Sequence, residues 1–150
     1  KICPEIALRT TFIVGFPGET DEHFKRLADF IEEAQFDHVG VFEYSDEEGV
    51  SAHRYPNKVP RDVAEARRDS LMEIQRNVSI RKNKERIGQI IPVLVEGFDE
   101  ESMLTTGRAP FQAPEIDGQI IIEEFDTEPG EIIQMKITRA MEYDLVARVV

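Results

Sequence analysis

The chain is poor in cysteine: Cys3 is the one cysteine among its 150 residues. A single thiol cannot form a disulfide within the chain, and this favours a reducing, cytoplasmic context. It also excludes a cysteine-ligated iron–sulfur cluster or zinc ion held by this chain alone, because such sites need about three or four thiolates. The three histidines have no ligand-like spacing, so no metal site is expected in this chain.

The chain also lacks long hydrophobic runs and an initiator methionine. No segment approaches the roughly 18 apolar residues of a membrane span, and the first residues do not have the pattern of a signal peptide. An apolar segment begins at Ile6, almost directly after Lys1. We therefore expect Lys1 to be an internal position of a longer protein.

Basic residues are scarce in the second half of the chain. Residues 88–150 hold 13 acidic and 4 basic residues, a formal charge of −9, whereas residues 1–87 hold 17 acidic and 14 basic residues. A surface of this sign repels a phosphate backbone, so the composition disfavours nucleic-acid binding and favours a basic protein partner. The alternative is that the acidity only keeps a small domain soluble.

The first half of the chain alternates between strand and helix patterns. Residues 6–14 are rich in β-branched and aromatic types, which predicts a buried strand. Gly-Phe-Pro-Gly at residues 15–18 ends this strand, and Thr20 is a suitable N-cap for an amphipathic helix. Residues 36–44 predict a second strand. Strand, helix and strand in succession form a βαβ unit, which implies that the two strands are parallel.

A long helix and a set of short strands follow. Residues 45–59 predict a polar loop, Pro60 is expected at the first position of the helix, and Gly88 is expected to end it. After Gly88 the apolar residues alternate, which predicts five short strands at residues 90–96, 103–108, 119–123, 132–138 and 145–149. Turns are expected between strands at Gly97, at residues 114–118 and at residues 129–130. Strands of this number and length favour a small closed barrel of OB type.

Two polar segments follow the predicted parallel strands, at residues 15–20 (Gly-Phe-Pro-Gly-Glu-Thr) and 42–49 (Phe-Glu-Tyr-Ser-Asp-Glu-Glu-Gly). In α/β folds, ligands bind at the carboxyl ends of parallel strands, and a helix N-terminus there offers free N–H groups. The two segments are therefore candidates for one ligand site. The alternatives are a plain strand-to-helix turn and a solvated acidic loop. A third segment, residues 113–118 (Ala-Pro-Glu-Ile-Asp-Gly), by itself predicts only a turn.

Taken together, these segments resemble the radical-SAM methylthiotransferase family over nearly the whole chain. Residues 9–20 and 39–45 are similar to the sixth-strand region of that family. Residues 67–75 (Arg-Arg-Asp-Ser-Leu-Met-Glu-Ile-Gln) are similar to its linker helix, and the chain after Gly88 is similar to its C-terminal TRAM domain.

Three segments resemble one branch of that family more than the others. They are residues 8–12 (Leu-Arg-Thr-Thr-Phe), 113–118 and 143–146 (Tyr-Asp-Leu-Val). Enzymes of this branch methylthiolate an aspartate of small-subunit ribosomal protein twelve, whereas another branch modifies tRNA. The resemblance thus implies a basic protein as the substrate.

The resemblance also implies a fold of the α/β plus all-β class. It implies the C-terminal portion of a radical-SAM (β/α) partial barrel in residues 1–60, a linker helix in residues 61–87, and a five-stranded OB-like TRAM β-barrel in residues 88–150. The cofactors it implies are S-adenosyl-L-methionine and two 4Fe-4S clusters, with the clusters ligated outside this chain. In such enzymes a radical formed from S-adenosyl-L-methionine removes hydrogen from the aspartate β-carbon, and a methylthio group is then added. No catalytic residue is expected in this chain, which is expected to be inactive by itself.

By the same resemblance, we expect cofactor contacts at the two strand ends and substrate contacts on the barrel. The expected cofactor-binding residues are Val14, Gly15, Pro17, Gly18, Glu19, Phe42, Tyr44 and Ser45. The expected substrate-binding residues are Arg108, Glu115 and Asp117. The acidic barrel is expected to attract the basic ribosomal protein in a salt-dependent way, and RNA binding by the barrel is not expected.

Three other interpretations stay open. One is a fragment of a tRNA methylthiotransferase, which the acidic balance of residues 88–150 disfavours. Another is a non-catalytic OB-like binding module on a helical stalk, which the βαβ pattern disfavours because a stalk has no need of strand ends directed at a ligand. The third is a radical-SAM enzyme of different chemistry that also carries a TRAM barrel.

Overall fold

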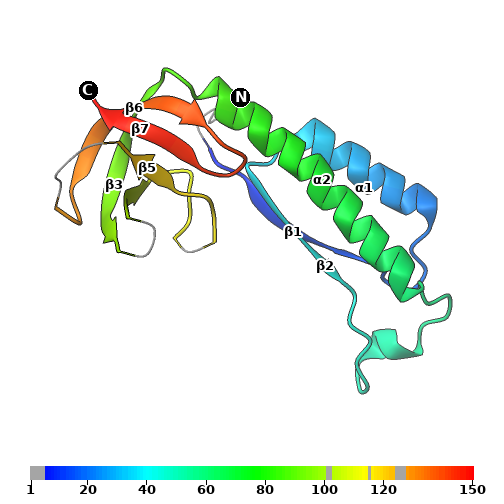
Figure 1. The fold of residues 1–150 in the computed structure, drawn as a ribbon. Helices are drawn as coiled ribbons and strands as arrows, with labels where there is room; N and C mark the ends of the chain where they lie inside the picture. Colours follow the sequence, from blue (N-terminus) through cyan, green and yellow to red (C-terminus); the bar gives the residue numbers. More distant parts are fainter. Residues whose placement is uncertain (1–5, 101–102, 115, 124–127) are drawn as a thin grey trace. The chain divides into compact units, whose positions relative to one another are not determined.

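The computed structural model describes residues 6–100, 103–114, 116–123 and 128–150, which divide into two compact units (Figure 1). Ala7–Val78 form the first, which we call the α/β unit. Ser79–Val150 make up most of the second, which we call the barrel unit. No helix in the described ranges is both long enough and apolar enough to cross a membrane.

The α/β unit contains the predicted βαβ arrangement. Its elements are β1 (Arg9–Val14), α1 (Asp21–Ala34), β2 (His38–Glu43), the short 3₁₀ helix η1 (Ser51–Arg54) and the start of α2 (Arg61–Glu85). Strands β1 and β2 pair in parallel, from Arg9 opposite His38 to Val14 opposite Glu43. The parallel pairing is therefore confirmed. Helix α2 begins one residue after Pro60, whose carbonyl accepts a hydrogen bond from the Ala64 amide at 3.1 Å.

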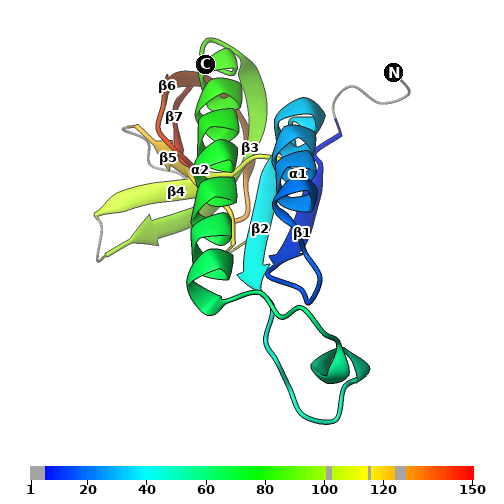
Figure 2. The same ribbon diagram turned by 90° about the vertical axis from the view of Figure 1, so that its right-hand side faces the viewer.

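Both helices of the α/β unit lie on the same face of the two-stranded sheet (Figure 2). Alternate strand residues point into this layer, as the period of a strand requires, and form a core with one residue from each helix: Val14, Ile31, Val39, Val41 and Leu71. The opposite face is not covered within this unit. There Ile13 is 57% exposed and its partner in the register, Phe42, is 62% exposed.

The barrel unit is a closed five-stranded barrel, as predicted. Its strands are β3 (Ile90–Asp99), β4 (Leu104–Arg108), β5 (Ile120–Ile122), β6 (Ile132–Ala140) and β7 (Leu145–Val149). Around the barrel they follow the order β3-β4-β5-β7-β6, and every neighbouring pair is antiparallel except β5 and β7. Inward-facing residues form one core: Val93, Val95, Ala109, Ile120, Ile122, Met135, Ile137, Leu145 and Ala147.

The end of α2 is bonded within the barrel unit. The Asn83 side chain donates to the Glu142 carbonyl at 3.3 Å, and the Arg86 guanidinium lies 4.0 Å from the centre of the Phe111 ring. Gly88 follows the helix with a φ of +88°, a conformation that glycine adopts readily, and its amide donates to the Ile137 carbonyl. Helix α2 itself ends at Glu85, so the predicted end at Gly88 is a few residues late, and Gly88 lies in the turn between α2 and β3.

One predicted turn is wrong. Gly97 was expected to end a strand, but it lies inside β3, which continues to Asp99. The pairing of β3 with β4 shifts by one residue between Val95 and Gly97, so Gly97 sits at a β-bulge. Its φ of +131° lies in a region that residues with a Cβ avoid, which explains the glycine. The strand continues past Gly97 because a bulge bends a strand without ending it.

Candidate functional site

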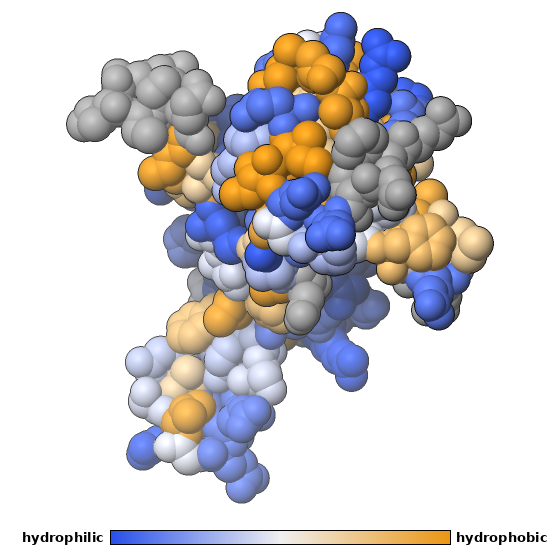
Figure 3. Space-filling model, turned by 90° about the vertical axis from the view of Figure 1, so that its left-hand side faces the viewer, coloured by the Kyte–Doolittle hydropathy of each residue, from blue (hydrophilic) through white to orange (hydrophobic). Residues whose placement is uncertain are grey.

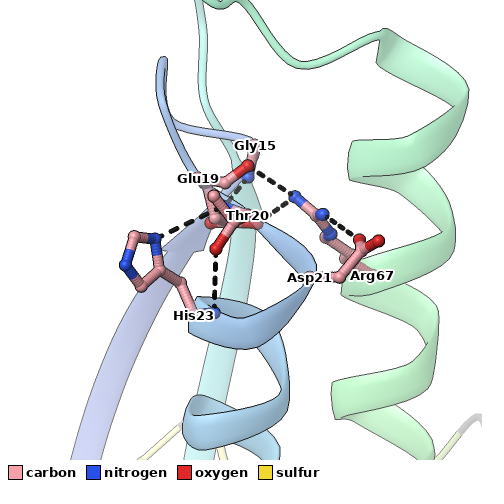
Figure 4. Close-up of polar contacts among 6 residues, drawn as sticks. All are labelled: Gly15, Glu19, Thr20, Asp21, His23 and Arg67. Atoms are coloured by element: carbon pink, nitrogen blue, oxygen red, sulfur yellow. Dashed lines mark hydrogen bonds and ion pairs between the residues drawn. The ribbon is translucent and has the colours of Figure 1, made fainter.

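The loop between β1 and α1 is ordered by the start of the helix (Figure 4). The Thr20 hydroxyl accepts a hydrogen bond from the His23 amide at 3.3 Å, and the Thr20 amide donates to His23 Nδ1 at 3.3 Å. This is a capping box in which histidine replaces the usual glutamate or glutamine. The predicted capping role of Thr20 is confirmed.

Glu19 joins this loop to helix α2 (Figure 4). Its Oε2 accepts a hydrogen bond from the Gly15 amide at 3.1 Å, and its Oε1 lies 2.6 Å from Nη1 of Arg67. The second guanidinium nitrogen, Nη2, lies 2.6 Å from Oδ1 of Asp21. The side chains of Arg67 and Glu19 are only 8% and 12% exposed, so this ion pair is largely removed from water.

Glycine at position 15 is needed for contact with α2. Its φ is +77°, in the region that residues with a Cβ avoid. A Cβ added there would lie 2.6 Å from the Cβ of Ala64, which is itself buried on α2. Packing within the protein therefore accounts for this glycine, without any ligand.

A cavity of about 490 Å³ lies at the ends of the two strands and the start of α2. Its wall is formed by Gly15, Pro17, Glu43, Tyr44, Ser45, Asp46, Lys58, Val59, Arg61 and Ala64. Its volume falls in the range of small-molecule sites. The structure thus brings the two candidate segments into one wall, as expected from the parallel strands.

Four of the eight residues predicted to bind the cofactor line this cavity, namely Gly15, Pro17, Tyr44 and Ser45. The other four lie in other environments. Val14 is fully buried in the core, and Phe42 is exposed on the uncovered face of the sheet. Gly18 donates its amide to the Asn57 carbonyl at 2.9 Å, and both carboxylate oxygens of Glu19 already have partners. A cofactor role stays a prediction for all eight.

Polar residues of the loop between β2 and α2 complete the cavity wall. Asp46 pairs with the Lys58 ammonium and lies 3.0 Å from Nδ1 of His53. The hydrogen bond from Lys58, followed by that from His53, lowers the pKa of Asp46 below its usual value. Partial removal from water, followed by the charge of Asp46, raises the pKa of Tyr44. The wall therefore carries mixed charge close to a phenol.

Lys58 and Arg61 were not predicted from the sequence. They flank Pro60, and sequence reasoning placed them in a loop and at a helix start without assigning them a role. They reach the site because the chain returns after η1 to the end of β2. The sequence of residues 45–59 does not by itself predict that the loop folds back to the end of β2. The two basic residues on either side of the predicted helix start could still have been proposed as ligand contacts.

On the barrel, a second cavity of about 440 Å³ is lined in part by predicted substrate-binding residues. Arg108 and Asp117 both line it, together with Glu96, Ala113, Pro114, Gly118 and Gln119. Nε of Arg108 lies 3.3 Å from Oε1 of Glu96, and Oδ2 of Asp117 accepts the Ala113 amide at 2.7 Å. Glu115, the third predicted residue, lies outside the described residues. The substrate role of all three stays a prediction.

Two of the segments that resemble one enzyme branch are in contact beside this cavity. A Cβ at Gly118 would overlap the carbonyl of Tyr143, so the two backbones approach as closely as glycine allows. The Gln119 amide donates to Oδ1 of Asp144 at 2.9 Å, and the Leu145 amide donates to the Gln119 carbonyl at 3.0 Å. Gly118 and Gln119 thus meet Tyr143, Asp144 and Leu145 at one corner of the barrel.

A wider groove of about 810 Å³ runs over β4, β5 and β7. Its apolar lining includes Phe98, Met103 and Val149, and two of the barrel's basic residues, Arg139 and Arg148, lie at it. Figure 3 shows one face of the chain, on which apolar side chains reach the surface among charged ones. Within the described residues, no group of three or more histidine, cysteine, aspartate or glutamate side chains is arranged to hold a metal ion.

Comparison with known proteins agrees with this arrangement. Residues 87–150 match the family model of the TRAM domain. The chain is 47% identical over 151 residues to ribosomal protein uS12 methylthiotransferase RimO of Proteus mirabilis, which covers 100% of this chain and 34% of the relative. The chain belongs to the RimO methylthiotransferase family. The RimO proteins of Syntrophotalea carbinolica (48% over 148 residues, 98% of this chain and 32% of the relative) and Aeromonas salmonicida (49% over 151 residues, 100% and 34%) are similarly related.

The chain spans about a third of the length of the RimO relatives that it matches. The similarity to RimO proteins and the match to the TRAM family model confirm the predicted family and the predicted TRAM barrel. The predicted division at residues 60 and 87 stays a prediction, because α2 begins in the α/β unit and ends in the barrel unit.

Proposed function

We propose that this chain is the C-terminal part of a radical-SAM methylthiotransferase of the cytoplasm. The whole enzyme adds a methylthio group to the β-carbon of an aspartate in small-subunit ribosomal protein twelve. The observation that carries the proposal is the similarity to RimO proteins, which extends over both units at 47–49% identity. The uncovered sheet face at Ile13 and Phe42 supports it, because parallel strands are normally covered on both faces, as in a complete barrel.

In this proposal the cavity at the strand ends holds part of S-adenosyl-L-methionine. That molecule has an apolar ring face, hydroxyl groups, a carboxylate and an ammonium group. The wall offers apolar surface from Pro17, Val59 and Ala64, together with charged and hydroxyl groups from Lys58 and Tyr44, so the residues present fit the cofactor. The bound cofactor supplies the radical that removes hydrogen from the substrate, and this chain supplies the wall that positions it. The 4Fe-4S clusters are ligated elsewhere in the enzyme, since one cysteine cannot hold them.

The barrel, in the same proposal, binds the basic protein substrate. Its charge of −9 attracts a basic partner and repels tRNA. Glu96 and Asp117 place carboxylates at the cavity beside the corner at which Gly118 meets Tyr143. These carboxylates act mainly on encounter and orientation, because exposed charges contribute little to the strength of a complex.

Binding of the full-length enzyme to the ribosomal protein and to tRNA, at about 50 and about 200 mM salt, tests the substrate assignment. We expect tight, salt-sensitive binding of the protein and weak binding of tRNA. Asp117→Asn keeps a hydrogen-bond acceptor for Ala113 but removes the charge, and we expect it to weaken protein binding about two- to fivefold. Asp29→Asn, the same charge change on exposed α1, is the matched control and is expected to have no effect.

Preferential tRNA binding would contradict the substrate assignment. It would point to the groove that carries Arg139 and Arg148 and would be lost in Arg148→Gln. The cofactor assignment has a separate test: Tyr44→Ala removes a wall residue and is expected to weaken S-adenosyl-L-methionine binding to the reconstituted enzyme. Unchanged affinity would remove the cavity from the cofactor site.

A further inference from the structure

We propose that Arg67 is a positioning residue for the cofactor site. It holds the loop of residues 15–20 through Glu19, and the loop in turn presents Gly15 and Pro17 to the cavity wall. The inference rests on the proposed function, because it assumes that the cavity binds S-adenosyl-L-methionine. Arg67 itself is not part of the cavity wall, so it acts through another residue.

The first support is the degree of burial of Arg67. Its side chain is 8% exposed, and its guanidinium is paired with Glu19 and Asp21 and lies 5.6 Å from the centre of the Phe24 ring. Removing a guanidinium from water is unfavourable unless its charge and its N–H groups have partners in the protein. Glu19 lies in the loop of residues 15–20, and Asp21 and Phe24 lie at the start of α1 directly after it, so none of these partners is on α2 itself.

The neighbouring residue on the helix makes a useful contrast. Arg68 is 35% exposed and pairs with Asp69 at 2.7 Å and Glu65 at 3.8 Å, both on its own helix, as well as with Glu43. Surface pairs of this kind contribute little to stability. Both arginines thus reach beyond α2, but Arg67 is almost buried and holds the loop between β1 and α1, whereas Arg68 is more exposed and pairs partly within its own helix.

The second support is that the two carboxylate oxygens of Glu19 bind different partners. One oxygen accepts from Arg67 and the other from the Gly15 amide, so the position of Gly15 depends on an ion pair. Without Arg67, the carboxylate of Glu19 would be a poorly solvated charge without its cation, and it would turn toward water. The Gly15 amide would then lose its acceptor, and the wall of the cavity would loosen.

The third support is the second contact of α2 with the same loop. Ala64 lies three residues before Arg67, so the two side chains share one face of the helix. Ala64 packs against Gly15 at a distance that excludes any Cβ, while Arg67 holds Glu19. The helix thus holds the loop at two points, by close packing at one and by charge at the other.

The test uses Arg67→Lys and Glu19→Gln in the full-length reconstituted enzyme. Lysine keeps the charge but cannot form the forked pair with two carboxylates. We expect the dissociation constant of S-adenosyl-L-methionine to rise about tenfold in either variant, as for other residues that orient ligand-binding groups. We also expect faster amide hydrogen exchange at residues 15–20 in the enzyme without cofactor, which reports on the loop independently of activity.

Leu71→Ala is the matched control for stability. Leu71 is fully buried in the core one turn further along the same helix, so its truncation lowers the melting temperature but removes none of the hydrogen bonds among Gly15, Glu19 and Arg67. We expect it to leave cofactor affinity and loop exchange nearly unchanged. Equal weakening of cofactor binding by Leu71→Ala and Arg67→Lys would overturn the inference, since general loss of stability would then explain both.

The double variant decides whether Arg67 acts through Glu19. We expect Arg67→Lys with Glu19→Gln to bind the cofactor no more weakly than the weaker single variant, and additive losses would overturn this. Normal binding by Arg67→Lys beside weakened binding by Tyr44→Ala would overturn the Arg67 inference alone. Normal binding by both variants would overturn the cofactor assignment and the positioning role together.

Discussion

The two units of this chain differ in how the backbone N–H and C=O groups of their strands are hydrogen-bonded. In the barrel, every strand has a hydrogen-bonded neighbour on each side, because the sheet closes on itself. In the α/β unit, β1 and β2 pair only with each other among the described residues, and one face of their sheet is left uncovered. Closure makes the barrel self-sufficient, whereas an open pair of parallel strands depends on further structure for its edges and its second face.

The largest expected difference between the two units is in their stability when each is produced alone. We expect Ser79–Val150 alone to unfold cooperatively, with a free energy of unfolding of about 3–5 kcal/mol. We expect Ala7–Val78 alone to show no cooperative transition and to bind a hydrophobic dye, because Ile13 and Phe42 are exposed. Urea titration followed by circular dichroism measures both. A cooperative transition in Ala7–Val78 without dye binding would contradict the comparison.

A glycine-to-alanine pair gives the next largest effect. Gly118→Ala would place a Cβ against the backbone of Tyr143, which cannot move without opening the barrel corner, and we expect a loss of about 3 kcal/mol. Gly40→Ala in β2 is the matched control, because its Cβ would make an ordinary contact of 3.5 Å with Thr11. Alanine there is expected to be neutral or to stabilise by about 0.5–1 kcal/mol, since glycine is unfavourable inside a strand. Denaturation midpoints measure both, and equal losses would show that the corner is not rigid.

The smallest expected effect concerns Asp46 at the strand-end cavity. Because its pKa is lowered in the folded state, its contribution to stability is complete above its usual pKa and is lost as the pH falls below about 4. We expect Asp46→Asn to lower the melting temperature slightly at pH 7, and we expect the difference from the unsubstituted protein to shrink as the pH falls and the carboxylate takes up its proton. A difference that persists at low pH would show that Asp46 acts through something other than its charge.

Much of the architecture was predictable from local patterns. The change from the helical to the alternating period after Gly88 predicted five strands, and all five are present in the barrel. Thr20 was recognised as a cap from its type and position alone. Gly97 was misread because glycine is compatible with both a turn and a bulge, and only the partner strand decides between them.

The candidate site was predictable only in part. Parallel strands end at the same edge, so the meeting of Gly15 with Tyr44 and Ser45 followed from the βαβ pattern. The partners of Glu19 did not follow, because Arg67 lies 48 residues further along the chain. A carboxylate after a glycine loop reads equally well as a ligand contact or as an internal one.

The sequence by itself determined the types of the elements, the cap of α1, the closed barrel and the excess of acid on it, because periodicity, capping chemistry and charge are properties of neighbouring residues. Only the tertiary structure decided that Glu19 faces α2, that Phe42 lies on the uncovered face, and that Gly118 meets Tyr143. These outcomes depend on which distant segments become neighbours. Burial then decides between pairing and exposure, since a charge removed from water must find a partner and an apolar ring needs a surface to cover it.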